Sequence, residues 1–169
     1  MARGEVSAGS AATASFDAQV DAVLSASRAL VGIAATSIAD IEGIVTIGQL
    51  RVLMLLATRD EVNLAAVARE LDVNPSNASR TVDRLHKAGL LDRYDSPTDR
   101  RHLALTLTDA GSALVQGVNG RRRAAVESIL HTMTPSARQS LAASLRKFAA
   151  AAGEPAEGGA AALLWPPIT

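Results

Sequence analysis

Cysteine is absent from this sequence of 169 residues, and aromatic residues make up only 2% of it. Without cysteine the chain has no disulfide, thiolate metal site, cysteine nucleophile or thiol-based oxidant sensor. With so few aromatic rings, the core must consist of small and aliphatic side chains, which favour helices. An excess of one charge is also lacking, because 17 basic and 17 acidic residues balance. An anionic partner must therefore bind a local basic surface.

The patterns of common enzymes and of membrane segments are missing as well. The sequence has no Gly-rich phosphate loop and no HExxH or GxSxG pattern. His86, His102 and His131 are scattered without metal-ligand spacing. No signal-peptide core and no uninterrupted apolar run of about eighteen residues is evident. We therefore expect a cytoplasmic protein that is not an enzyme, has no metal or cofactor, and does not contact membranes.

Helical periodicity dominates the region between two low-complexity ends. From Phe16 to Ile41 the apolar residues recur at intervals of three and four, which predicts one long amphipathic helix. Thr46 with Gln49 three residues later forms a capping-box pattern, and Pro75 suits the first turn of a helix. Further helices are predicted to begin after residues that favour the N-cap position, namely Thr46, Asn63, Asn74, Thr108 and Thr134.

A hairpin is predicted before the helix that begins at Thr108. Leu103, Leu105 and Leu107 alternate with other residues, a period of two that is typical of a strand. A turn cluster at 96–99 precedes them, so Leu91–Tyr94 are expected to form the partner strand. The predicted fold class is mainly α with a small β-hairpin wing: a winged helix-turn-helix with long N- and C-terminal helices.

The helix that begins after Asn74 is the expected recognition helix, which enters the major groove of DNA by its N-terminal residues. Ala78, Val82 and Leu85 share one stripe and should face the core. Asp83 is expected to pair with Lys87 or Arg80 on the same helix.

The opposite side of this helix is the expected DNA-contacting surface. It comprises Ser76, Asn77, Ser79, Arg80, Thr81, Arg84 and Lys87. Ser76, Asn77 and Arg80 lie nearest the N-terminus and are expected to reach base edges, whereas Arg84 and Lys87 suit phosphates.

Two parts of the sequence resemble the MarR (multiple antibiotic resistance regulator) family. The first is the wing and its exit, Asp95-Ser-Pro-Thr-Asp99-Arg100-Arg101 followed by Leu103-Ala-Leu-Thr-Leu-Thr-Asp-Ala-Gly111. The second is the helix-turn-helix, through Ala68-Arg-Glu-Leu71, Ser79-Arg-Thr-Val-Asp-Arg-Leu85 and Ala88-Gly-Leu-Leu91. The resemblance covers about Gln49 to Gly111, and the flanking helices agree only in position and amphipathicity.

The resemblance implies roles for the wing tip. In this family an arginine at the tip enters the minor groove, while a neighbouring aspartate orients the turn. Arg101 is the first candidate for insertion and Arg100 the second, because a narrow minor groove attracts arginine. Asp99 is then structural.

The resemblance also implies a homodimer that binds double-stranded DNA at a palindromic operator, most commonly as a repressor. Many members bind small aromatic or phenolic effectors between the dimer helices and the DNA-binding unit, so such an effector is an expected partner. One alternative is a monomer whose long helices fold back on it. Another is a module that contacts only proteins, against which the basic wing tip argues.

The expected organisation follows from these assignments. It comprises a flexible tail over 1–15, a dimerisation helix over 16–45, the winged domain over 46–111, dimerisation helices over 112–152 and a Gly/Ala/Pro-rich tail over 153–169. Trp165 lies in the last tail and is expected either to remain loose or to dock. Arginine far outnumbers lysine and alanine is abundant, which indicates a high-GC genome.

Overall fold

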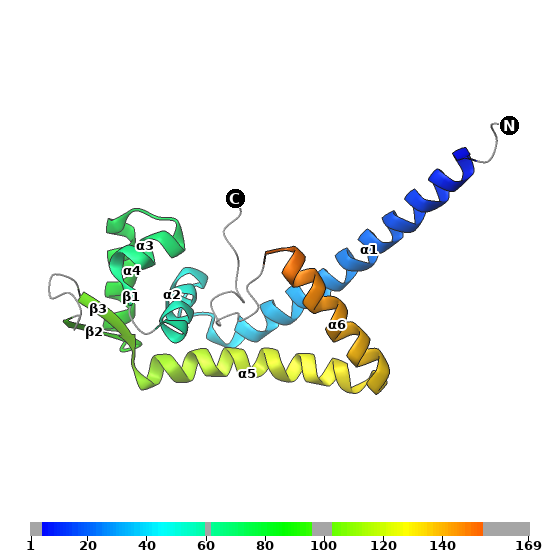
Figure 1. Cartoon of the computed structure of the whole chain (residues 1–169). Coiled ribbons are helices and arrows are strands. Elements are labelled where there is room, and N and C mark those ends of the chain that lie inside the picture. Colours follow the sequence, from blue (N-terminus) through cyan, green and yellow to red (C-terminus); the bar gives the residue numbers. More distant parts are fainter. Residues whose placement is uncertain (1–4, 60–61, 96–102, 154–169) are drawn as a thin grey trace. The chain divides into compact units, whose positions relative to one another are not determined.

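The computed structural model describes the backbone of residues 5–59, 62–95 and 103–153, and the side chains of 15–59, 62–94 and 103–153 (Figure 1). The chain divides into two units, Met1–Thr36 and Ser37–Thr169, which are described separately. Trp165 and the rest of 154–169 lie outside the described residues, and so do 1–4.

The first unit consists of most of helix α1 (Glu5–Ile38), whose last two residues belong to the second unit. The helix begins well before the expected Phe16, inside the stretch predicted to be a flexible tail. Its large apolar side chains are exposed, including Phe16, Leu24 and Val31. The stretch Ser15–Ile41 is long and apolar enough to cross a membrane by length and composition alone, a property shared by many helices of soluble proteins.

The second unit contains the predicted succession of helices and the hairpin. Its elements are η1 (Ala39–Ile41), α2 (Ile47–Thr58), β1 (Val62–Asn63), α3 (Leu64–Leu71), α4 (Pro75–Lys87), β2 (Leu91–Asp95), β3 (Leu103–Leu107), α5 (Asp109–His131) and α6 (Pro135–Ala151). The fold is therefore mainly helical with a small antiparallel sheet, as the sequence predicted.

Local hydrogen bonds set the helix starts. The Thr46 hydroxyl accepts from the Gln49 backbone N–H at 3.3 Å, and the Thr46 N–H donates to the Gln49 side chain at 2.7 Å, so the capping box is complete. The four other predicted caps each accept a hydrogen bond from the backbone N–H three residues later: Asn63, Asn74, Thr108 and Thr134. Each bond satisfies a backbone donor that the helix itself leaves free.

Helix α2 forms the centre of the second unit. All residues from Val52 to Leu56 are buried, so every face of this helix is covered. Helices α3, α4 and α5 and strand β3 pack around it. The core includes Val67 of α3, Leu91 of β2 and Val118 of α5. The apolar α2 is thus a core helix of this unit.

The sheet has three strands in the order β1-β3-β2. The predicted hairpin pairs Leu91 with Leu107 and Arg93 with Leu105. The sequence analysis missed β1, where Val62 pairs with Leu105. A strand of two residues cannot display a period of two, so the alternation that revealed β3 was not available there.

The junction between the sheet and α5 is tightly packed. The Thr108 N–H donates to the Leu90 carbonyl at 3.3 Å, and its hydroxyl donates to the Gly89 carbonyl at 2.7 Å. A Cβ atom at Gly111 would collide with the Leu90 carbonyl oxygen. Glycine at 111 therefore allows the first turn of α5 to lie directly against the end of α4.

Candidate nucleic-acid interface

Helices α3 and α4 pack together as a helix-turn-helix. The turn begins at Asp72, the C-cap of α3, which adopts a left-handed conformation with φ of 53°. Its N–H donates to carbonyls of the last turn of α3, and Asn74 then caps α4. Two polar residues that tolerate these backbone conformations thus reverse the chain within three positions.

One face of α4 is anchored in the core. Ala78 and Leu85 are 0% exposed and Val82 is 2% exposed. This confirms the predicted inward stripe. Because α4 can turn only with its core contacts, the opposite face is held in one orientation toward solvent.

The predicted DNA-contacting residues lie on that opposite face or at its edges. Five of them are exposed: Ser76, Asn77, Arg80, Arg84 and Lys87. Ser79 and Thr81 are half-buried, and the Thr81 hydroxyl donates to the Asn77 carbonyl at 3.0 Å. The structure therefore presents three basic side chains in solvent, Arg80 in the N-terminal half of α4 and Arg84 and Lys87 in its last turn.

Asp83 has a partner that the sequence analysis did not consider. Its carboxylate accepts a charge-assisted hydrogen bond from Arg93 of β2, rather than pairing with Lys87 or Arg80 as expected. This hydrogen bond holds the pKa of the Asp83 carboxyl below its ordinary value, and desolvation opposes the effect in part. The expectation failed because it considered only neighbours one helical turn away, whereas the hairpin brings Arg93 back against α4.

The wing strands leave α4 and return to α5. Asp95 of β2 is paired with Leu103 of β3 at the outer end of the hairpin. The predicted tip residues Asp99, Arg100 and Arg101 lie in 96–102, outside the described residues. Their assigned roles remain predictions that follow from the family resemblance.

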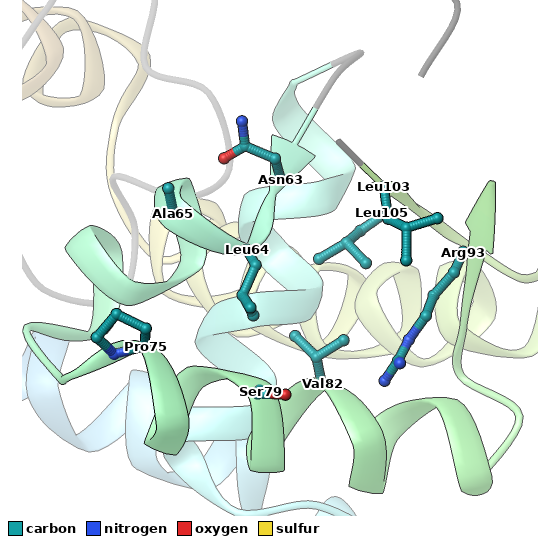
Figure 2. Close-up of a pocket in the computed structure, with 9 residues that line it drawn as sticks. All are labelled: Asn63, Leu64, Ala65, Pro75, Ser79, Val82, Arg93, Leu103 and Leu105. Carbon is teal, nitrogen blue, oxygen red and sulfur yellow. The ribbon is translucent and has the colours of Figure 1, made fainter. Parts of the chain in front are cut away.

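A cavity of about 450 Å³ lies between α3, α4 and the sheet (Figure 2). Leu64, Val82 and Leu105 give it an apolar lining, while Ser79 and Arg93 contribute polar groups. In Figure 2 the Arg93 side chain reaches from its strand toward the helix that carries Ser79 and Val82. This cavity lies within the winged unit, whereas the effector site was expected between that unit and the dimer helices.

Other ties hold the elements behind this surface. The Arg51 guanidinium of α2 donates to the Glu70 carbonyl of α3 at 2.5 Å. In α5, the Arg121 guanidinium donates to the Ser37 carbonyl at 2.9 Å and lies 3.5 Å from the Asp40 carboxylate. Within the part of the chain that the structure describes, no three His, Cys, Asp or Glu side chains are grouped as metal ligands would be.

Known proteins share this architecture. The MarR family model matches residues 45–103. The crystal structure of RV1404 from Mycobacterium tuberculosis has 43% sequence identity and a TM-score of 0.74, covering 82% of this chain and 94% of that one. The YusO protein of Bacillus subtilis has 28% identity and a TM-score of 0.66, with 80% and 97% covered.

Among curated proteins, the transcriptional repressor MdtR of Bacillus subtilis is 32% identical over 90 residues, which are 53% of this chain and 58% of MdtR. The matched segments span 34% to 58% of the length of the curated relatives. These relatives are described as regulators of transcription. With the winged helix-turn-helix in place and a relative of 43% identity aligned over nearly its whole length, the chain belongs to the MarR family of DNA-binding transcriptional regulators.

Proposed function

We propose that this protein is a cytoplasmic repressor that binds a palindromic operator as a homodimer, with α4 in the major groove and the wing in the minor groove. The observation that carries the proposal is the two-sided character of α4. Its buried stripe fixes the helix, and its exposed side carries Arg80, Arg84 and Lys87. A basic surface on a rigid element is what phosphate and base contacts require.

The residues of α4 divide into two roles by their distance from its N-terminus. Ser76, Asn77 and Arg80 read base edges, with Ser79 and Thr81 at the margin of the surface. Arg84 and Lys87 bind phosphates further along the helix. Arg101, or else Arg100, enters the minor groove, and Asp99 orients the wing turn.

Exposed apolar side chains support the homodimer. In the second unit Ile129, Leu145 and Phe148 are 44% to 56% exposed, and no described residue of α6 is buried. In the first unit the large apolar residues of α1 are exposed as well. Such surfaces are rare on soluble monomers and normally mark an interface. The apolar stripes of the C-terminal helices predict a dimer surface formed by Leu114, Val118, Val126, Ile129, Leu130, Leu141, Leu145 and Phe148. Val118 instead lies in the core.

The cavity supports regulation by a small molecule. A space of about 450 Å³ lined by aliphatic groups and one guanidinium suits a small aromatic or phenolic compound. Because Pro75 and Ser79 of α4 line it, a bound compound would touch the recognition helix directly. We therefore place the effector beside α4.

Selection of bound sequences from a random DNA pool tests the proposal, followed by mobility shifts with excess nonspecific DNA. We expect an inverted repeat with half-sites about one helical turn apart. A single unrepeated site, or no retained sequence, would contradict the proposal that a homodimer binds a palindromic operator. Repression is tested separately, by a reporter placed behind the selected site.

The division of roles on α4 is tested by Arg80→Ala and Arg84→Ala. Arg80→Ala should cost about 1 to 3 kcal/mol at the selected site and relax base preference there. Arg84→Ala should weaken all duplexes alike, because phosphates carry no sequence information. If both variants lose affinity equally for selected and random duplexes, Arg80 does not read bases.

A further inference from the structure

The recognition helix and the wing are joined by a charged pair whose two members lie ten positions apart in sequence. Arg93 of β2 donates to the Asp83 carboxylate of α4. The side chains are 30% and 44% exposed, respectively, so the pair is partly shielded from water. Ion pairs in such positions are screened less by salt than fully exposed pairs.

The Arg93 side chain is packed along its length. On the sheet its residue stands opposite Leu105, and its side chain lines the cavity with Leu105 and Val82 (Figure 2). The Nε atom is buried and has no hydrogen-bond partner among the described residues. The stem thus lies against the cavity wall while the charged end meets Asp83. A side chain held in this way is poorly suited to follow a DNA phosphate.

A second tie lies nearer the base of the hairpin. The His86 Nδ1 atom is 3.0 Å from the Leu91 carbonyl oxygen. A carbonyl only accepts, so Nδ1 carries the proton and donates. Arg93 is two residues further along β2, toward the wing tip. Leu91 and Leu105 hold the base of the hairpin in the core, and the two ties along β2 add direct connections between this strand and α4.

We propose that Asp83 and Arg93 are positioning residues that set the direction of the wing against the recognition helix, and that Arg93 does not itself contact DNA. The proposal rests on the proposed function, since it concerns how α4 and the wing reach adjacent grooves together. A dimer presents two such units, so a change in wing direction would displace both minor-groove contacts at once.

The direction in which Asp83→Asn changes DNA affinity separates this role from a direct phosphate contact by Arg93. If Arg93 bound a phosphate, Asp83→Asn would tighten binding by removing a nearby negative charge. If the pair positions the wing, Asp83→Asn must weaken binding although it removes a charge that repels DNA. Asp72→Asn is the matched control, because Asp72 is exposed in the turn before α4 and asparagine tolerates its left-handed backbone. We expect this control to leave affinity unchanged or to raise it slightly.

The experiment uses the full chain, the duplex selected from the random pool and a random duplex of equal length. We expect Asp83→Asn and Arg93→Gln each to lower affinity for the selected duplex about tenfold, and the double variant to be no weaker than either single one. Protection of the minor grooves at the flanks from hydroxyl radicals should weaken. Protection of guanine N7 atoms in the central major grooves from methylation by dimethyl sulfate should persist, whereas loss of folding would remove it.

Several results would contradict the positioning role of Asp83 and Arg93. One is an Asp83→Asn protein that binds as tightly as Asp72→Asn. Another is additive losses, together with a flatter dependence of affinity on salt for Arg93→Gln alone, which would make Arg93 a phosphate ligand. Uniform loss of protection together with a lowered melting temperature would reduce the pair to a role in stability. Failure of the unmodified chain to retain any duplex would instead refute the proposed function.

Discussion

The winged unit and the long helices use apolar residues in opposite ways. In α2 every residue from Val52 to Leu56 is buried, and α4 buries its whole apolar stripe. In α1 the large apolar residues are exposed, and α6 has no buried residue among those described. One region thus completes its core within a single chain, while the other leaves apolar surface exposed, which we propose a second chain covers. Sequence periodicity alone does not distinguish the buried stripe of α4 from the exposed stripe of α6, because both give amphipathic helices.

The comparison predicts its largest effect in the core of the winged unit. Leu53→Ala should lower the free energy of unfolding by about 2 to 5 kcal/mol, because Leu53 is 0% exposed and its loss leaves a cavity. Urea titration followed by circular dichroism measures this. Leu145→Ala in α6 is the counterpart, and at concentrations where the protein is monomeric it should unfold nearly like the parent. If Leu53→Ala and Leu145→Ala lowered the free energy of unfolding equally, the core of the winged unit and the surface of α6 would not differ as proposed.

The long helices should show the reverse pattern. Phe148→Glu places a charge on an exposed apolar surface and should weaken self-association more than about tenfold while sparing the fold of the monomer. Sedimentation over a range of concentrations measures the change. Gln139→Glu, at an exposed position of the same helix, adds the same charge and should leave association nearly unchanged. A parent protein that sediments only as a monomer would contradict the proposal that the exposed apolar surface of α6 mediates self-association.

Two glycines of α5 test how closely this helix is joined to the winged unit. Gly111→Ala should destabilise the fold by about 1 to 3 kcal/mol, because its Cβ would collide with the Leu90 backbone. Gly120→Ala meets nothing within 4 Å and should stabilise the helix by up to about 1 kcal/mol. Thermal melts of both variants beside the parent measure the difference. If both substitutions raised the melting temperature, the backbone at Leu90 would have moved to make room for the added methyl group at position 111.

The smallest effect concerns the pH dependence of the Asp83–Arg93 pair. Because the pKa of Asp83 is lower in the folded state, the pair stabilises the fold above the unfolded pKa of about 4. That contribution is lost as the pH falls through the folded value. Asp83→Asn should therefore melt at a lower temperature than the parent at pH 6, and the difference should shrink as the pH falls below about 4. A difference that stays constant over this range would show that the charge of Asp83 does not stabilise the fold.

What the sequence predicted depends on how far apart the interacting residues are. The cap at Thr46 involves residues three positions apart, so it was visible in the sequence. The partner of Asp83 was not visible, because it depends on how the hairpin folds back onto α4. The assignment of Val118 failed for a similar reason, since periodicity identifies an apolar face without saying whether its own chain or another covers it. The early start of α1 reflects alanine-rich sequence whose helix propensity needs no apolar period.

The junction at Thr108 has a mechanical consequence. Its two hydrogen bonds to the segment after α4, together with the close approach at Gly111, join the recognition helix and the first turn of α5 into one rigid corner. From this corner α5 runs for 23 residues, a length of roughly 34 Å. Because Val115 and Val118 also anchor α5 in the core, α5 and the winged unit rotate together. A rotation of this body by about five degrees about the corner moves the far end of α5 by about 3 Å, and a displacement of that size imposed at the far end turns α4 by the same small angle.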